Sequence, residues 1–207
     1  MANHVFSYLE LRQGNDKAKA FFKEWVMAMQ RGSEEGDPYI GIEFLYGDRP
    51  KDEDEHWGWF TNNVGSKWLT VEDAYDEEIS MTTAWDSPDA LFEQLVEKLK
   101  VLDPNVQLTM TYDDEMPNFV GLWYYNGEND DLDCEHYDSE YYHTLLKSDA
   151  GLEEEALCEK YDIDPDDSDA IWDKYSELRD EFWELWHTEQ ANIIQSVMTK
   201  EEDEDLA

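Results

Sequence analysis

The sequence predicts an α+β fold, in which helices cover one face of an antiparallel sheet and a helical extension follows. Three observations support this prediction. Segments with a period-two alternation of apolar and polar residues are interspersed with segments of helical periodicity. Their order of strand, helix, strands, helix, strand, strand suits a sheet with helices on one face. Beyond about residue 130 the pattern becomes mainly helical.

The first predicted elements are a strand and a helix. Residues 5–12 are rich in β-forming side chains that alternate between the two faces of a strand. Asn15 and Asp16 are suitable N-caps for a helix over 17–29. Gly32 is the expected end of that helix.

Three strands and two non-strand segments are expected next. Residues 39–46 have the aromatic and β-branched content of a short strand, and 48–55 are expected to form a charged loop. The tryptophan cluster at 57–59 is expected in or near the sheet. Residues 67–74 and 77–85 are the following predicted strands.

A second helix and a second pair of strands complete the predicted sheet. Ser87 is the expected N-cap, with Pro88 at the first helical position. The helix places four leucines on one stripe, namely Leu91, Leu95, Leu99 and Leu102. Strands are predicted at 106–112 and 118–125, and Asn126-Gly127 is a strong turn signal.

The C-terminal third is predicted to contain a short helix over 152–161 and a long helix over 168–198. Trp172, Trp183 and Trp186 cannot all share one face of the long helix. One of them is therefore a candidate for an exposed residue that anchors a partner.

The composition sets limits on domains and partners. We expect an α+β domain at 1–140, a helical extension at 141–200 and an acidic tail at 201–207. The chain has 53 acidic and 15 basic residues, a net charge of −38. Such a surface repels phosphate, so we expect no direct binding of nucleic acid or of an anionic membrane. The 9 Trp, 12 Tyr and 8 Phe indicate a folded, aromatic core rather than a disordered acidic chain.

Several features concern the compartment. No apolar run approaches the roughly 20 residues that span a bilayer. The N-terminus has neither a basic region nor an apolar region of a signal peptide. The two cysteines, Cys134 and Cys158, fit a reducing compartment or a single bridge. We therefore expect a cytoplasmic protein.

Several motifs in the middle of the chain resemble a known family. They are Gly65-Ser66-Lys67-Trp68, Thr83-Ala84-Trp85-Asp86-Ser87-Pro88, and Thr111-Tyr112-Asp113-Asp114-Glu115 leading to Phe119-Val120-Gly121. Together with the opening Met1-Ala2-Asn3-His4-Val5, they resemble the YubB-type ferredoxin-like domain of plasmids and bacteriophages, over about residues 1–140. The resemblance implies a ferredoxin-like sheet and a mobile-element origin. It does not imply a cofactor or established catalytic residues.

Motifs for catalysis and metal binding are weak. Residues 162–173 have the Asp-x-Asp-x-Asp rhythm of a calcium loop, but Asp167 replaces the usual Gly and Asp173 the usual Glu. The alternative is an acidic helix start. Cys134, His136, His143 and Cys158 do not have the usual zinc-ligand spacing. No phosphate-binding glycine loop and no local catalytic set occurs, so we expect no enzyme and no cofactor.

The charge is the strongest functional signal. Averaged over the expected surface it is roughly 265 Å² per net charge, against roughly 110 Å² for B-DNA, so acids gathered on one face reach the density of DNA. A net charge of about 2–8 suffices for solubility of a small domain. The chain far exceeds this and has its acids in runs. The candidate partner-binding residues are Asp52, Glu53, Asp54, Glu55, Asp113, Asp114, Glu115, Glu128, Asp130, Asp131, Asp133, Glu135, Asp162, Asp164, Asp166 and Asp167.

The leading hypothesis is a phage- or plasmid-encoded nucleic-acid mimic that acts in the host bacterial cytoplasm. It would block the basic DNA- or RNA-binding channel of a host defence protein, such as a restriction or CRISPR enzyme. One alternative is an inhibitor or adaptor that binds a different surface through its C-terminal helices. A second alternative is a divalent-metal-binding protein.

Overall fold

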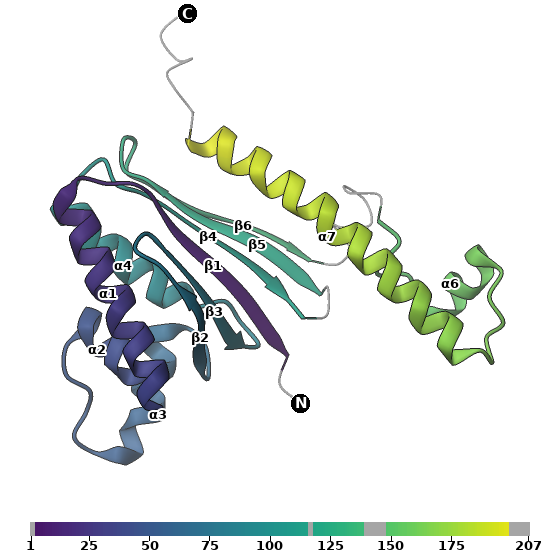
Figure 1. Cartoon of the computed structure of the whole chain (residues 1–207), viewed down its shortest axis with the longest axis horizontal. Helices are drawn as coiled ribbons and strands as arrows, with labels where there is room; N and C mark the ends of the chain where they lie inside the picture. The colour runs from purple at the N-terminus through teal and green to yellow at the C-terminus, as the bar shows by residue number, and fades with distance from the viewer. Residues whose placement is uncertain (1–2, 116–117, 139–147, 199–207) are drawn as a thin grey trace, which may run out of the picture.

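The computed structural model describes residues 3–115, 118–138 and 148–198. It has a mixed α+β architecture, with one open antiparallel sheet and helices around it (Figure 1). The described helices are Asp16–Glu35 (α1), Tyr39–Tyr46 (α2), Glu53–Val64 (α3), Asp89–Leu102 (α4), Glu154–Tyr161 (α6) and Ser168–Met198 (α7). The strands are His4–Gln13 (β1), Leu69–Ala74 (β2), Glu78–Ala84 (β3), Gln107–Asp114 (β4), Phe119–Asn126 (β5) and Asp131–Asp138 (β6).

The sheet has six strands in the order β2-β3-β1-β4-β5-β6, and every neighbouring pair is antiparallel. Strand β1 lies inside the sheet, where Leu9 is opposite Ile79 of β3 and Met110 of β4. The helix α4 connects β3 to β4, which pairs on the other side of β1. The predicted α+β class with an antiparallel sheet is confirmed.

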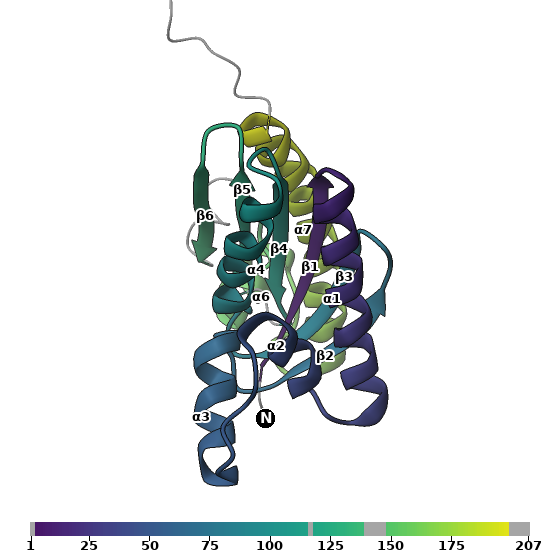
Figure 2. The ribbon, with the colours of Figure 1, turned by 90° about the vertical axis from the view of Figure 1, so that its left-hand side faces the viewer.

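The main core lies between the sheet and the layer formed by α1, α2, α3 and α4, which Figure 2 shows on one side of the sheet. Alternation along β1 directs Leu9 and Leu11 into this core. The predicted leucine stripe of α4 is largely confirmed, because Leu91, Leu95 and Leu99 are buried there.

Helix α1 begins as predicted but ends later. The side chain of Asn15 accepts hydrogen bonds from the backbone N–H groups of Lys17 (2.9 Å) and Ala18 (3.0 Å). The helix continues past Gly32 to Gly36, whose φ of 70° is the left-handed conformation that favours glycine at a helix end. Gly32 instead permits a close approach, because a Cβ there would lie 2.7 Å from the carbonyl oxygen of Asp37.

The strand predicted at 39–46 is wrong, since this segment forms helix α2. Its strand-like composition is overridden by packing against α1. Gly41 lies so close to α1 that a Cβ would be 2.1 Å from the sulfur atom of Met29. Helical spacing also directs Ile42 and Leu45 into the core.

The charged loop predicted at 48–55 ends early, and the tryptophan cluster lies in a helix rather than in or near the sheet. Asp52 caps α3 by accepting a hydrogen bond from the N–H of Asp54 (3.1 Å), so the acidic run begins this helix. Trp57 and Trp59 follow within α3.

The start of α4 shifts by one residue, because Pro88 takes the N-cap position expected for Ser87.

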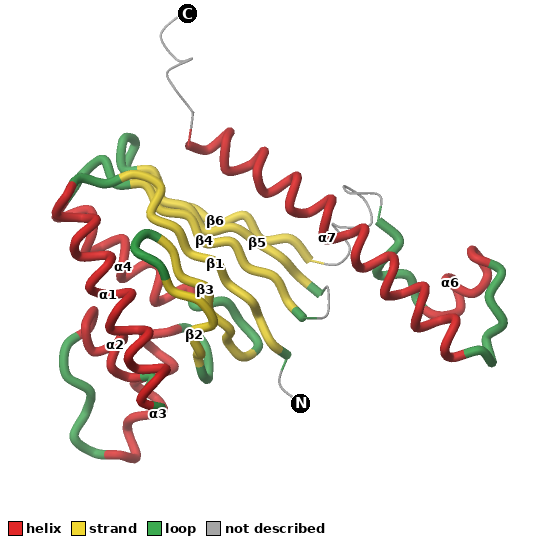
Figure 3. Tube along the Cα trace, viewed as in Figure 1, coloured by secondary structure: helices red, strands yellow, loops and turns green. Residues whose placement is uncertain are grey.

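Two features of the sheet go beyond the prediction, namely a further strand at its edge and a helix on its second face. Residues 131–138 form strand β6, which pairs with β5 from Asn126 opposite Asp131 to Phe119 opposite Asp138. The second half of α7 packs on the sheet face opposite α1–α4 (Figure 3). Helices α1–α4 cover one face of the sheet, and the predicted helical extension covers part of the other face through α7. Among the described residues, no helix has the length and apolar character to cross a bilayer.

Candidate functional site

The first predicted acidic cluster lies on the helical layer. Asp52, Glu53, Asp54 and Glu55 are all exposed at the N-terminus of α3. Carboxylates at this end of a helix interact favourably with its dipole, which gives the cluster a local structural role. Figure 1 shows α3 and α7 on opposite sides of the sheet, so this cluster lies apart from the acids of α7.

The second predicted cluster is not a surface patch. The side chain of Asp114 is buried and accepts hydrogen bonds from the amides of Asn118 and Asn3 (3.4 Å for Asn3). Burial and the neighbouring Asp114 raise the pKa of Asp113 to about 7. Only Glu115 is exposed, and it contacts His4 at 3.2 Å. Asp113 is half-buried and Asp114 is buried, so their carboxyl groups are less accessible to a partner than that of Glu115.

The third predicted cluster divides between a turn and a strand. Glu128 and Asp130 are exposed in the turn between β5 and β6, and Asp130 accepts a hydrogen bond from the hydroxyl of Tyr125 (3.0 Å). Three further acids alternate along β6 on one face of the sheet, namely Asp131, Asp133 and Glu135.

The acids of β6 lie on the face that α7 covers. Asp133 is opposite Tyr124, which packs with Val197 of α7. Burial, followed by the charges of Asp131, Asp133 and Glu135, raises the pKa of Tyr124 to about 12. These carboxylates therefore flank the line along which α7 contacts the sheet.

The fourth predicted cluster forms the connection between α6 and α7. Asp162 ends α6 in the left-handed conformation, with a φ of 55°. Asp164 accepts a hydrogen bond from the N–H of Asp166 (3.0 Å), and Asp167 accepts one from the N–H of Ala170 (3.1 Å). The calcium-like rhythm thus forms a turn and a helix start, which is the alternative that the sequence left open.

No group of three or more metal-ligating side chains is found within the described residues. Of the imagined zinc set, Cys134 lies on β6 and Cys158 is buried on α6. His143 lies outside the described residues.

Helix α7 carries an acidic surface that the sequence analysis missed. Five exposed carboxylates recur every three or four residues along its first half, namely Asp169, Asp173, Glu177, Asp180 and Glu184. At about 100° per residue they fall within an arc of about 80°. They lie opposite the buried side chains Ile171, Leu178 and Phe182. Because two or three other residues separate each of them from the next in the sequence, a search for contiguous acidic runs does not find them. The signal that finds them is their helical spacing.

We call these five residues the α7 stripe. Of the predicted clusters, Asp162–Asp167 leads directly into it along the chain. The stripe is not purely negative, because Lys174 contacts Glu177 at 3.0 Å and Arg179 lies within the same segment.

The tryptophans of α7 separate as the sequence predicted. Trp172 is 64% exposed, whereas Trp186 is 1% exposed and packs edge-on against Tyr137. Trp183 is half-buried beside Phe182. The prediction that one tryptophan is exposed is confirmed, and that residue is Trp172.

A cavity of about 470 Å³ lies between α6 and the start of α7. Most of its lining is apolar and includes Ala150, Pro165, Ile171, Trp172 and Tyr175. A small buried cluster adjoins the cavity and consists of Leu157, Cys158, Ile171 and Leu178. The hydroxyl of Tyr175 donates a hydrogen bond to the carbonyl oxygen of Leu152 (2.8 Å), which ties the segment before α6 to α7.

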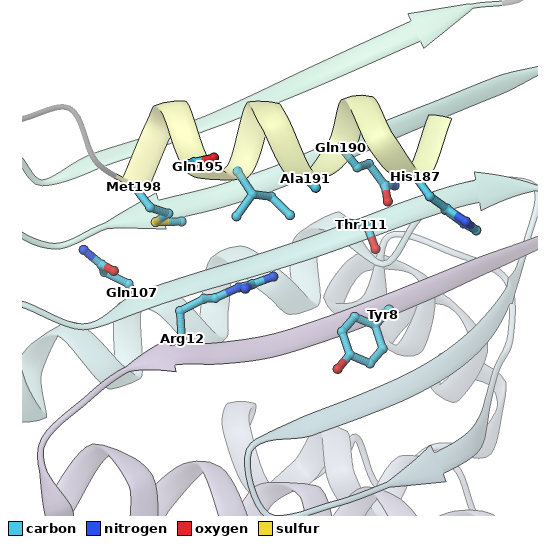
Figure 4. A pocket seen from close by; sticks show the side chains of 10 residues that line it. Tyr8, Arg12, Gln107, Thr111, His187, Gln190, Ala191, Gln195 and Met198 are labelled. Atoms are coloured by element: carbon cyan, nitrogen blue, oxygen red, sulfur yellow. The ribbon is translucent and has the colours of Figure 1, made fainter. Parts of the chain in front are cut away.

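A groove of about 560 Å³ lies between α7 and strands β1 and β4 (Figure 4). None of the residues that the structure places along it is acidic, and Arg12, its only lysine or arginine, contacts Glu10 at 2.8 Å. Gln190 points from α7 toward β4 and is 8% exposed. The groove is therefore lined by amide, hydroxyl and apolar side chains together with Arg12 and His187.

A Cys–Tyr–His group spans strands β4 and β6. The hydroxyl of Tyr112 lies 3.4 Å from the sulfur of Cys134 and 2.9 Å from Nδ1 of His136. Burial raises the pKa of the Cys134 thiol, and nearby carboxylates raise it further. Because the thiolate is the nucleophile, this environment does not favour covalent catalysis.

Comparisons with known proteins do not assign the chain to a family. No protein-family model matches the chain, and no curated protein matches it.

Proposed function

We propose that the chain is an acidic binding protein that mimics nucleic acid and blocks the DNA- or RNA-binding channel of a basic host defence protein. The observation that carries this proposal is the α7 stripe. Its residues are exposed, ordered on one side of a helix, and directed away from the protein's own core. A phage or plasmid origin, the YubB-type family and a location in the bacterial cytoplasm belong to the same proposal.

The order of strands supports a ferredoxin-like core within this protein. The connectivity β1-α1-β2-β3-α4-β4, with the order β4-β1-β3-β2, is that of a split βαβ arrangement. Helices α2 and α3 are an insertion between α1 and β2, and β5 and β6 extend the sheet beside β4. On this interpretation the extension provides the surface on which α7 is held.

The spacing of the stripe approaches that of phosphates. The distance along the axis from Asp169 to Glu184 is about 22 Å at 1.5 Å per residue. Six carboxylates lie in this segment when Glu181 is included, which is one per about 4–5 Å. A strand of B-DNA has one phosphate per about 3.4 Å of axis. The first half of α7 therefore offers a linear array of charge that a basic channel can follow.

The proposed mechanism is competition without chemistry. Lys and Arg side chains that normally hold phosphates would pair with the carboxylates of α7 and of Asp162–Asp167. The strong negative field would speed the encounter with a basic partner. Affinity would fall steeply with salt, because exposed charges are screened.

The test is to measure binding to purified basic nucleic-acid enzymes, restriction and CRISPR effectors among them, with and without competing DNA and RNA. We expect the nucleic acid to displace the protein. A stripe variant with D169N, D173N, E177Q, D180N and E184Q is expected to bind at least tenfold more weakly and with less dependence on salt.

The matched control removes five charges from the opposite side of the sheet, with E34Q, E35Q, E53Q, D54N and E55Q. It keeps the N-cap Asp52 and is expected to bind within about twofold of the wild type. Binding that excess DNA and RNA leave unchanged would refute mimicry, as would equal losses in the two variants.

A second candidate function is supported by Trp172 and the apolar cavity beside it. A protein that binds a target surface unrelated to nucleic-acid binding could use these features, with the charge serving only as a complementary rim. The competition experiment separates the two candidates, since such a target would remain bound in the presence of DNA.

A further inference from the structure

The unit formed by α6 and the first half of α7 combines a mainly apolar cavity with a strongly acidic surface. Its most exposed large hydrophobic side chain, Trp172, lines that cavity. Residues 148–184 around it comprise 15 acidic and 3 basic residues, a net charge of −12. An exposed apolar site with a charged rim is the pattern of an interaction surface.

The cavity exists because α6 is too short to cover α7. Helix α6 has 8 residues and α7 has 31. The residues of α7 that line the cavity recur at helical spacing, namely Ser168, Ile171, Trp172, Tyr175, Ser176 and Arg179. Leu157 and Cys158 of α6 are buried against part of this face, and Ala150, Leu152, Tyr161 and Ile163 pack beside them. Trp172 remains 64% exposed, so the cavity is open to solvent at this residue.

The charges around the cavity specify the partner. Of the three basic residues, Lys160 pairs with Asp149 and Lys174 pairs with Glu177, so both are already neutralised. Arg179 lines the cavity, where its aliphatic stem adds apolar surface. Glu154 lines the cavity itself, and the exposed acids Asp164, Asp166, Asp167 and Asp169 are next to the lining residues Pro165 and Ser168 in the chain.

We propose that this cavity receives an apolar side chain from a lysine- and arginine-rich segment of the partner protein. The anchor would enter beside Trp172, and the flanking basic residues would pair with the acidic rim. The inference deepens the proposed function by naming the part of the target that is recognised. It also explains how a polyanion could distinguish one basic protein from another, because charge alone does not discriminate between cationic channels.

The experiment uses two fluorescein-labelled peptides of equal charge. Both are 16-residue lysine-rich helical peptides; one has leucine at two central positions four residues apart, and the other has alanine there. Fluorescence anisotropy with the full-length protein is measured from low to physiological salt. We expect the leucine peptide to bind at least tenfold more tightly, with the same dependence on salt for both peptides.

Two variants test whether the preference for the leucine peptide arises in the cavity. Trp172→Ala removes a wall of the cavity, and Ser176→Phe fills it from the same helix face. Both are expected to lose most of the preference for leucine while retaining the binding of the alanine peptide. Trp57→Ala is the matched control, because Trp57 is 60% exposed but lies on α3. It is expected to keep the preference.

Equal binding of the two peptides by the wild-type protein, including a failure of both to bind, would overturn the inference. So would a preference for leucine that survives in both cavity variants. These outcomes are distinct from a failure of mimicry, which is measured by competition with nucleic acid and by the stripe variant. The cavity could bind its anchor even if the target surface has no role in binding nucleic acid.

Discussion

The helical layer beside the sheet and the C-terminal helices are stabilised in different ways. The first has one continuous core in which 23 buried hydrophobic residues from α1–α4 and the sheet are in contact. Helix α7 shares three small clusters, whose buried members number three, four and three. The same chain therefore contains a densely packed layer and a helix that is attached at separate points.

This difference explains where the charge can accumulate. A continuous core tolerates only a few buried carboxyl groups, because burial without a partner is costly. A helix attached along one narrow face leaves most of its circumference in solvent. The first half of α7 can therefore carry acids on one side and an uncovered apolar cavity on another. The comparison predicts that substitutions in the two regions differ in how much stability they remove and in how much of the molecule they affect.

The largest effect is expected in the main core. Phe92 of α4 is fully buried, and its ring lies 6.0 Å from that of Trp123. Phe92→Ala is expected to lower the free energy of unfolding by about 3–5 kcal/mol, because it leaves a cavity in a well-packed site. Urea denaturation followed by circular dichroism measures this loss. Val101→Ala is the control on the same helix, because Val101 is 80% exposed, and a comparable loss there would contradict the assigned core.

The next effect should be local to α7. Trp186 packs with Val120 and Phe182 in a small cluster, so Trp186→Ala is expected to cost about 2–3 kcal/mol, below the usual range for a large core, because a small cluster can relax. Hydrogen exchange should become faster in α7 and remain slow in β1 and β4. Leu185→Ala, at a half-exposed position of the same helix, should change neither region. Uniformly faster exchange throughout the sheet would show that the two regions unfold together.

The next effect depends on pH and is expected from the half-buried carboxyl group of Asp113, near the end of β4. The pKa of Asp113 is raised to about 7, so the folded protein keeps a proton that the unfolded chain releases near pH 4. Between about pH 4 and pH 7 the folded state binds more protons, and stability from this group therefore falls as the pH rises.

Asp113→Asn should remove the loss of stability that accompanies the rise in pH. The variant is expected to be more stable than the wild type at pH 8, by at most about 4 kcal/mol, with the difference shrinking toward pH 4. Denaturation curves at several pH values test this expectation. Asp48→Asn changes an exposed acid and is the control. A difference that does not vary with pH would argue against a raised pKa.

The smallest effect on stability is expected from the α7 stripe. Asp173, Glu177, Asp180 and Glu184 include like-charge pairs four residues apart, which destabilise a helix by about 0.2–0.5 kcal/mol each. Replacing them with amides is expected to leave stability unchanged or to raise it by up to about 1 kcal/mol. Thermal melting at low and high salt provides the measurement. Marked destabilisation would mean that these acids serve the fold rather than a partner.

Most elements could be predicted from local pattern, and the failures have physical causes. Helix α7 was predicted at 168–198, as observed, because its apolar residues repeat at helical spacing over many turns. Strand β6 was missed because its face beside α7 carries Asp131, Asp133 and Glu135, so no apolar alternation marks it. Helix α2 was read as a strand because its composition is strand-like and only contact with α1 makes it helical.

The candidate functional surfaces also combine features that the sequence predicts with features that it does not. Composition alone determined the strong negative charge and indicated the aromatic core, since these depend on which side chains are present. The exposure of one tryptophan in α7 also followed from helical geometry. The arrangement of these side chains in space did not follow from the sequence. Pairing of β6 with β5 and packing of α7 on the second sheet face determined which acids point outward, which are buried, and where an apolar cavity stays uncovered. These features depend on contacts between residues far apart in the chain, and local periodicity carries no information about them.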